Sequence, residues 1–214
     1  MPAPDFSFES IVIAQGFLPC GVDEAGRGPW AGPVVAAAVV LDPRNIPPGL
    51  NDSKKLTEAK REALFDPIMR SARVGVGIAS AELIDDINIL QATYRAMRDA
   101  VEALGKHATM ALVDGNRAPP LSIRTQTIIE GDGKCLSIAA ASIIAKVTRD
   151  RMMHQLHLQY PGYGFAKHKG YGTAFHMAAL QRIGPCAAHR KSFKPIATLT
   201  ISGQFDSRRS PEDS

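Results

Sequence analysis

The sequence predicts a mixed β-sheet covered by helices, a fold in the α/β or α+β range. Three observations support this prediction. Residues 34–41 form a run of β-branched residues and alanines, which is typical of a strand buried on both faces. Apolar residues recur at alternating spacings of four and three between Leu83 and Leu104, which predicts an amphipathic helix. Residues 137–158 predict a second long helix, whose small-residue face suits close packing on a sheet.

Length and composition indicate a folded protein. The 214 residues and 23.0 kDa fit one domain, or one domain with a small appendage. Hydrophobic residues make up 45% of the chain and charged residues 21%, which excludes a wholly disordered or collagen-like protein. The longest apolar run, Val34 to Leu41, is too short to span a membrane, and the N-terminus lacks a signal-peptide pattern. Three cysteines without a CxxC pair indicate reduced thiols. We therefore expect a cytoplasmic protein with no membrane association.

The first half of the chain alternates strands with turns and one helix. A strand ends at residues 21–23, and the buried strand at 34–41 follows it. Residues 42–53 contain three prolines and a glycine, which predicts a loop. Thr57 can cap a helix that runs to about residue 70. Apolar residues alternate with glycines over 73–79, which predicts a third strand against which another element packs closely.

The second half begins with the helix predicted over 80–104, which Gly105 ends. Its single apolar stripe comprises Leu83, Ile87, Leu90, Tyr94, Met97, Val101 and Leu104. The elements expected after it are strands at 110–113 and 124–129, the long helix at 137–158, a loop at 161–164, a helix at 173–183 and a frayed tail over 199–214. Short connections allow the first strands to pair antiparallel, whereas the later strands need a helical crossover.

The charge is unevenly distributed. Residues 134–194 carry ten basic residues and one acid, Asp150, which gives this segment +9 and leaves −5 for the rest of the chain. Such asymmetry favours a half that faces a polyanion, with a solvated basic surface as the alternative. The basic residues are Lys134, Lys146, Arg149, Arg151, Lys167, Lys169, Arg182, Arg190, Lys191 and Lys194.

Four carboxylates, Asp23, Glu24, Asp114 and Asp132, follow predicted strands. Such a set without neighbouring Cys or His suits Mg²⁺ or Mn²⁺, which prefer oxygen ligands. Ordinary turn and cap residues are the alternative. Successive strand residues face opposite ways, so Asp23 and Glu24 cannot both reach one metal from a regular strand. Either the backbone breaks at Glu24, or one of the two binds through its main-chain carbonyl.

Two further segments suit nucleic acid. Gly26-Arg27-Gly28 allows close backbone approach to a ligand beside an arginine that can bind phosphate, although taken alone this pattern favours a simple turn. Residues 160–172 interleave tyrosines with lysines, which suits stacking and phosphate contact, and the lysines at 54 and 55 can also contact phosphate. The six histidines are scattered and predict surface or structural roles.

Together these motifs resemble ribonuclease HII, the bacterial type 2 ribonuclease H family, over about residues 17–196. The matching segments, in the expected order, are DEAGRGPWAGPV from Asp23, DSKKL from Asp52, VDGN from Val113, GD at 131–132, SIAAASIIAKVTRD from Ser137, HKGYGT from His168 and HRKSF from His189. The resemblance implies a ribonuclease H-like fold, with a mixed sheet of about five strands flanked by helices and extra C-terminal helices.

The resemblance also implies the chemistry. The family cuts the RNA strand of RNA–DNA hybrids and cuts duplex DNA on the 5′ side of single embedded ribonucleotides, with Mn²⁺ or Mg²⁺. Two metal ions about 3.5–4 Å apart are expected to assist hydrolysis, leaving 3′-hydroxyl and 5′-phosphate ends. The roles carried over are metal binding and catalysis for Asp23, Glu24, Asp114 and Asp132, 2′-hydroxyl recognition for Gly26, Arg27 and Gly28, junction packing for Tyr171, and phosphate contact for Lys54 and Lys146.

Residues 17–196 are thus expected to form the catalytic domain with a C-terminal helical extension. They lie between an N-terminal segment, 1–16, and a flexible tail, 197–214, whose Gln204-Phe205-Asp206 resembles a sliding-clamp-binding peptide. We expect a monomer that acts in ribonucleotide excision repair. Two alternatives stay open: a nucleic-acid-binding module with a decayed active site, and a metal-dependent nuclease of the same fold that acts on DNA structures.

Overall fold

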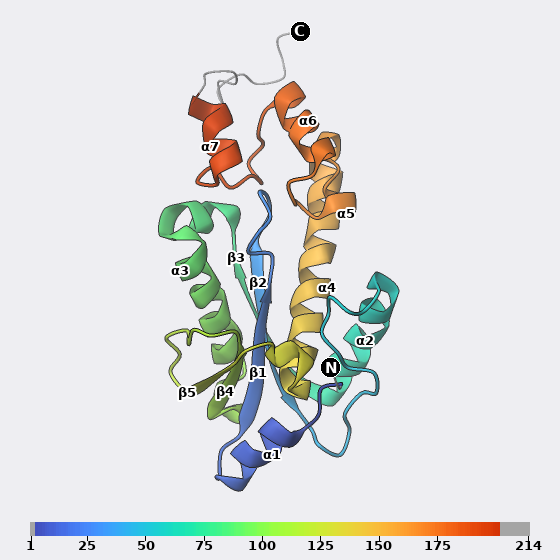
Figure 1. The fold of residues 1–214 in the computed structure, drawn as a ribbon, viewed down its shortest axis with the longest axis vertical. Coiled ribbons are helices and arrows are strands. Elements are labelled where there is room, and N and C mark those ends of the chain that lie inside the picture. Colours follow the sequence, from blue (N-terminus) through green and yellow to red (C-terminus); the bar gives the residue numbers. More distant parts are fainter. Residues whose placement is uncertain (1–2, 202–214) are drawn as a thin grey trace.

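The computed structural model describes residues 3–201, which form a five-stranded mixed sheet flanked by helices (Figure 1). The strand order is β3-β2-β1-β4-β5. The first three strands pair antiparallel, whereas β4 runs parallel to β1, and β5 parallel to β4. The strands are β1 (Pro19–Ala25), β2 (Val34–Leu41), β3 (Ala72–Ala79), β4 (Met110–Asp114) and β5 (Arg124–Ile128). The predicted strands and the mixed sheet are confirmed.

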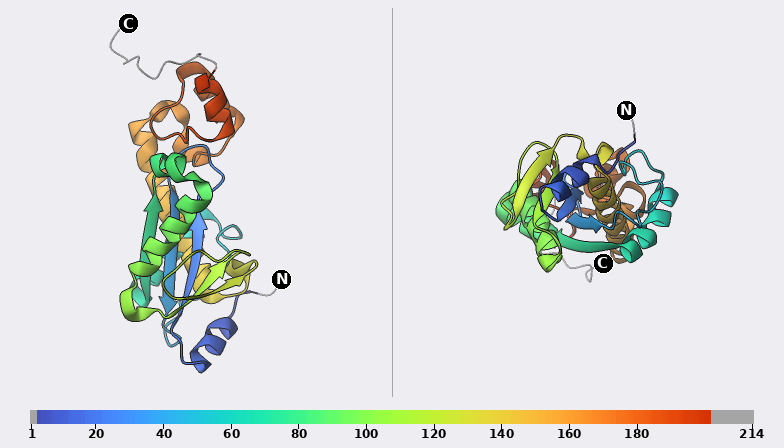
Figure 2. Two further views of the ribbon diagram at one scale, coloured as in Figure 1. Left: turned by 90° about the vertical axis from the view of Figure 1, so that its left-hand side faces the viewer. Right: turned by 90° about the horizontal axis from the view of Figure 1, so that it is seen from below.

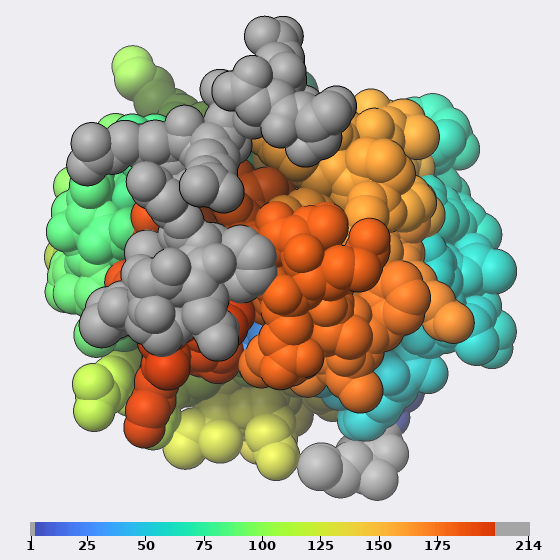
Figure 3. Space-filling model, turned by 90° about the horizontal axis from the view of Figure 1, so that it is seen from above, coloured from blue at the N-terminus to red at the C-terminus, as the bar shows by residue number. Residues whose placement is uncertain are grey.

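Helices cover both faces of the sheet and extend beyond one end of it. Helix α3 lies on one face, and α4 and α2 lie on the other (Figure 1). The helices are α1 (Ser7–Ala14), α2 (Glu58–Ser71), α3 (Ala81–Glu102), α4 (Leu136–Gln159), α5 (Phe165–His168), α6 (Ala174–Ile183) and α7 (Lys194–Ile201), with 3₁₀ turns η1 (Gly105–His107), η2 (Gly131–Gly133) and η3 (Pro161–Tyr163). Helices α5, α6 and α7 gather at the far end of α4, as Figure 2 shows from the side and Figure 3 from above.

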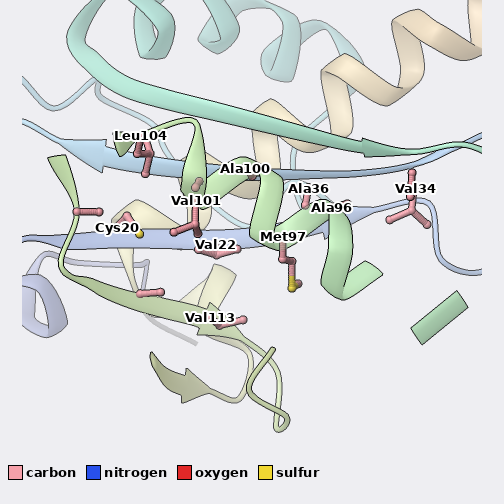
Figure 4. Packing of buried hydrophobic residues seen from close by; sticks show 14 of the residues in the cluster. Cys20, Val22, Val34, Ala36, Ala96, Met97, Ala100, Val101, Leu104 and Val113 are labelled. Atoms are coloured by element: carbon pink, nitrogen blue, oxygen red, sulfur yellow. The ribbon is translucent and has the colours of Figure 1, made fainter. Parts of the chain in front are cut away.

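The core on the α3 face joins the sheet to the C-terminal half of that helix. Met97 and Val101 of α3 pack against Val22 of β1 and Val113 of β4 (Figure 4). The glycines of β3 allow the closest approach, because a Cβ on Gly77 would overlap the carbonyl oxygen of Ala96. The close packing predicted for this strand is therefore confirmed.

Helix α3 differs from the single amphipathic helix that the sequence predicts. It breaks at Asn88, whose backbone is non-helical with φ 65° and ψ 162°. The Asn88 side chain accepts hydrogen bonds from the amides of Leu90 and Gln91, at 3.0 and 3.1 Å, and so caps the second half. In the first half the predicted stripe is only partly right: Leu83 packs against the core, but Ile87 is 36% exposed and Ile84 is buried instead.

Three further features differ from the predictions. Strands β4 and β5 are parallel although a loop at 115–123, and no helix, connects them. Helix α1 was not predicted, since it is short and its N-cap residue, Phe6, provides no side-chain cap. Helix α7 continues to Ile201, where a tail was expected from residue 197; Gln204-Phe205-Asp206 lies outside the described residues. Within residues 3–201 we find no helix that is long and apolar enough to cross a membrane.

Candidate active site

Three acids converge at the ends of neighbouring strands. Asp23 lies near the end of β1, Asp114 ends the adjacent parallel strand β4, and Asp132 lies in η2. One carboxylate oxygen from each lies within 4.8 Å of the other two. The register explains the first pair, because Val22 lies opposite Val113 and the next residue on each strand is the acid. The amide of Gly131 donates to Oδ1 of Asp114 at 2.7 Å and ties the η2 loop to β4.

The carboxylate of Glu24 lies outside this group of three. Strand β1 continues through Ala25, which pairs with Val35, so the backbone does not break at Glu24 as one alternative requires. The Glu24 side chain instead contacts Arg27, with 3.4 Å between Oε1 and Nη1. It still borders the site, because it lines two adjoining hollows with Asp114.

The electrostatics of the acids suit a cation. Burial, with the charges of Glu24 and Asp114, raises the pKa of Asp23 well above its usual value, and burial also raises the pKa of Asp132. Clustered carboxylates repel one another, and a divalent cation removes that penalty. The Lys54 ammonium already lies 3.1 Å from Oδ2 of Asp132. Burial opposes its charge, but Asp132, Asp23 and Asp52 together outweigh this and raise the pKa of Lys54 to about 12. The oxygen donors therefore fit Mg²⁺ or Mn²⁺.

The predicted substrate-binding residues share one hollow of about 250 Å³ with Asp23, Glu24 and Asp114, whereas Asp132 is not part of its lining. Tyr171 is 48% exposed, and a Cβ on Gly28 would lie 3.8 Å from its ring. The Lys146 ammonium lines the same hollow and pairs with Asp150 at 2.8 Å. The predicted members of the lining are Asp23, Glu24, Gly26, Arg27, Gly28, Lys54, Asp114, Lys146 and Tyr171. A second hollow of about 330 Å³ lies on the other side of Glu24, and its Asn116 and Arg117 were not predicted.

Two arginines that were counted as polyanion-facing are instead buried. Arg190, with 0% of its surface exposed, donates to the carbonyls of Gly26, Arg27, Pro29 and Gly32 at 2.6–2.9 Å. Burial lowers its pKa to about 9. Its role was missed because each of these carbonyls lies more than 150 positions away in the sequence.

Arg149 also holds the glycine-rich loop, residues 26–33, by donating to backbone carbonyls. Its guanidinium donates to the carbonyls of Ala31, Pro33 and Lys169 at 2.9–3.1 Å. It therefore connects the loop to the segment that carries Tyr171.

These two arginines fix the direction in which the backbone carbonyls of the glycine-rich loop point. Its carbonyls at Gly26 and Arg27 point to Arg190. Within residues 3–201, the exposed amides of Arg27 and Gly28 donate to no protein acceptor. Because these amides border the hollow that holds Asp23, they are available to an oxygen of a bound ligand.

Buried histidines support the Tyr171 segment from behind. His176 donates from Nδ1 to the Tyr171 carbonyl at 2.9 Å, so as a neutral ring it accepts at Nε2 from Nε2 of His189, also at 2.9 Å. His189 in turn accepts at Nδ1 from the Cys186 amide at 2.9 Å. His168 stacks on His176 with ring centroids 4.6 Å apart. The structural role predicted for histidines is confirmed for these three.

Comparisons with known proteins agree with this arrangement. The family model for ribonuclease HII matches residues 20–196. A ribonuclease HII from Parvibaculum lavamentivorans is 56% identical over 201 residues, which cover 94% of this chain and 75% of the relative. A ribonuclease HII from Jannaschia sp. is 54% identical over 197 residues, covering 92% of this chain and 98% of the relative.

Solved structures share the fold. Ribonuclease H2 from Pyrococcus horikoshii is 27% identical with a TM-score of 0.73, covering 88% of this chain and 99% of that one. Ribonuclease HII from Archaeoglobus fulgidus, solved in a complex with PCNA, is 27% identical with a TM-score of 0.70, covering 82% and 95%. Bst-RNase HIII in complex with Mn²⁺ is 19% identical with a TM-score of 0.72, covering 89% and 70%. The sheet and helices described above are thus those of a ribonuclease H-like fold.

Proposed function

Because the chain belongs to the ribonuclease HII family, whose members are metal-dependent endoribonucleases that cut RNA in RNA–DNA hybrids, we propose that it also nicks duplex DNA on the 5′ side of a single embedded ribonucleotide. The observation that carries the proposal is the three-acid cluster beside the free amides of Arg27 and Gly28. The acids supply the hydrolytic site, and the amides supply donors for a group that only RNA carries. The products are 3′-hydroxyl and 5′-phosphate ends.

Asp23, Asp114 and Asp132 would hold Mg²⁺ or Mn²⁺ through their carboxylates, and Glu24 would contribute its main-chain carbonyl. Bound there, the metal supplies a water of lowered pKa and stabilises charge on the phosphate. The protein's own contribution is positioning. Strands β1 and β4 fix two acids in register, and the Gly131 amide orients the Asp114 carboxylate.

Selection of RNA rests on the 2′-hydroxyl, the one group that the two sugars do not share. The amides of Arg27 and Gly28 donate to it, while Arg190 keeps the adjacent carbonyls turned inward. The half-exposed ring of Tyr171 lies beside Gly28 and packs against the sugar at the junction with the next deoxynucleotide. Lys54 and Lys146 contact phosphates from the opposite rim of the hollow.

The test uses a DNA duplex with one ribonucleotide and the same duplex without it. We expect a nick only in the first, on the 5′ side of the ribonucleotide, and loss of cutting when a chelator is added. Asp23→Asn should abolish the nick, whereas Asp66→Asn, at an exposed carboxylate of α2, serves as the matched control and should leave it unchanged. Cutting of both duplexes would instead favour a general DNA nuclease, and binding without cutting would favour the binding-module alternative.

The cellular setting is part of the same proposal. The enzyme works as a monomer in the cytoplasm, in ribonucleotide excision repair. It contacts a sliding clamp through Gln204-Phe205-Asp206, and the support for this contact is the Archaeoglobus relative solved with PCNA. Clamp binding that survives deletion of residues 202–214 would contradict the role of this peptide.

A further inference from the structure

One buried carboxylate is not a member of the acid cluster in the active site. Glu9 of α1 is only 1% exposed. Its Oε1 accepts a hydrogen bond from the Ser137 amide at 2.6 Å and a weaker one from Sγ of Cys135 at 3.2 Å. A buried carboxylate is costly unless donors satisfy it. Both donors reach Oε1, and Oε2 is buried without a hydrogen-bond partner among residues 3–201. A carboxylate kept at this cost indicates a specific role for the side chain.

The bond to Ser137 caps α4 from outside that helix. The N-cap residue Cys135 provides no side-chain cap of its own. The first amides of a helix have no partner within it, and a negative charge at that end is favourable. Glu9 precedes Ser137 by 128 positions and supplies the side-chain hydrogen-bond acceptor that the N-cap of α4 lacks.

The backbone around Asp5 strengthens the same junction. The Asp5 amide donates to the Lys134 carbonyl at 3.2 Å, and its carbonyl accepts from the Leu136 amide at 3.1 Å. Residues 5–9 thus hold residues 134–137 at three points along the chain. Figure 1 shows α1 beneath the sheet, close to the start of α4.

This junction continues directly into the acid cluster. The Cys135 amide donates to the Gly131 carbonyl at 2.8 Å, and the Gly131 amide holds Asp114. Asp132 lies between them in η2. The start of α4 also rests on β1, because a Cβ on Gly21 would overlap the backbone of Ser137. The loop that carries one acid and orients another is therefore anchored through Cys135 to the first turn of α4.

We propose that Glu9 is a positioning residue for the metal site: it fixes the first turn of α4, and so the η2 loop, in the arrangement that binds the divalent cation. This inference rests on the proposed metal site. It assigns a part in metal binding to residues 5–9, which precede the segment that matches the family model.

The experiment measures Mn²⁺ binding directly, by electron paramagnetic resonance of the free ion, without substrate. Glu9→Ala removes the acceptor, and Glu9→Asp withdraws the carboxylate by one methylene group. Both should weaken Mn²⁺ binding about tenfold, the lower end of the range for residues that orient metal ligands. Glu9→Gln keeps an acceptor oxygen and should stay close to wild type.

Ser80→Ala is the matched control, because Ser80 caps α3 by accepting from the Leu83 amide at 3.1 Å and lies on the other face of the sheet. It should lower the melting temperature without changing Mn²⁺ affinity. If Glu9→Ala fails to fold, Glu9→Asp decides the question.

The outcomes separate the two proposals. Wild-type affinity in both Glu9→Ala and Glu9→Asp, with only the melting temperature lowered, would overturn the positioning role and leave the metal site intact. If Asp23→Asn binds Mn²⁺ as wild type does, the metal site itself is wrong, and so is the proposed function.

Discussion

Replacing Arg190 with methionine tests whether the glycine-rich loop is held from behind. The guanidinium donates four hydrogen bonds, at 2.9 Å to Gly32, 2.8 Å to Pro29, 2.9 Å to Arg27 and 2.6 Å to Gly26. Methionine fills part of the volume but donates nothing. The carbonyls of the loop then lose the partner that turns them inward.

The magnitude follows from these four bonds. A hydrogen bond contributes about 1 kcal/mol net, which gives about 4 kcal/mol for the set. The loss would be a large fraction of a typical stability of about 5–15 kcal/mol. Arg190→Lys has three donors on one atom and cannot span the four carbonyls, so we expect about half the loss to remain.

The assay combines urea denaturation with cleavage of duplexes with and without a ribonucleotide. We expect Arg190→Met to lose about 4 kcal/mol and, under conditions where it is folded, to discriminate poorly between the two duplexes. Arg182→Met, at an exposed position of α6, is the control and should change neither property. A loss below about 1 kcal/mol, or full discrimination by the folded variant, would refute the reasoning.

Four further predictions concern the site and its surroundings. Asp23→Asn should abolish turnover while hybrid binding, measured by fluorescence polarisation, persists; retained cleavage would remove this residue from the metal site. Tyr171→Ala should reduce nicking at a single ribonucleotide far more than it lowers the melting temperature, and an equal effect on both would make it a core residue. Burial lowers the pKa values of His176 and His189 to about 4, so the unfolded chain binds more protons between about pH 6.5 and pH 4. Urea titrations should therefore show that the free energy of unfolding decreases as the pH is lowered from about 6.5 to 4, on the order of 3 kcal/mol per histidine. A flat profile would contradict the buried arrangement. Lys54→Gln should reduce the slope of log affinity against log salt by about one, and an unchanged slope would exclude a phosphate contact.

The clustering of Asp23 and Asp114 could be predicted from the sequence, although β1 runs on to Ala25 and does not end before Asp23. Val22 and Val113 are each followed by an aspartate, and parallel neighbours place those aspartates side by side. The alternation rule also explains why Glu24 departs from the group of three. The rule could not decide between a break and a regular strand, since that depends on the pairing of Ala25 with Val35.

What the sequence could not provide are contacts between distant segments. Periodicity describes which face of an element is apolar, and it does not reveal that Glu9 caps a helix 128 positions later. It also fails where one polar side chain overrides the pattern, as Asn88 does by capping the second half of α3. Short helices whose N-cap residue is apolar, such as α1, depend on their packing and are hard to predict from local sequence.

The basic segment, residues 134–194, contains both buried and exposed cations. Three of its ten cations, Arg149, Lys169 and Arg190, are buried, because a guanidinium or ammonium can satisfy several backbone carbonyls at once. Among the residues that the structure describes, its exposed cations without an ion pair are Lys167, Arg182, Lys191 and Lys194. Only exposed cations can exchange counterions with a polyanion. In the function proposed above, the buried arginines would act on the substrate indirectly, since they hold the backbone of the loop whose amides would bind it.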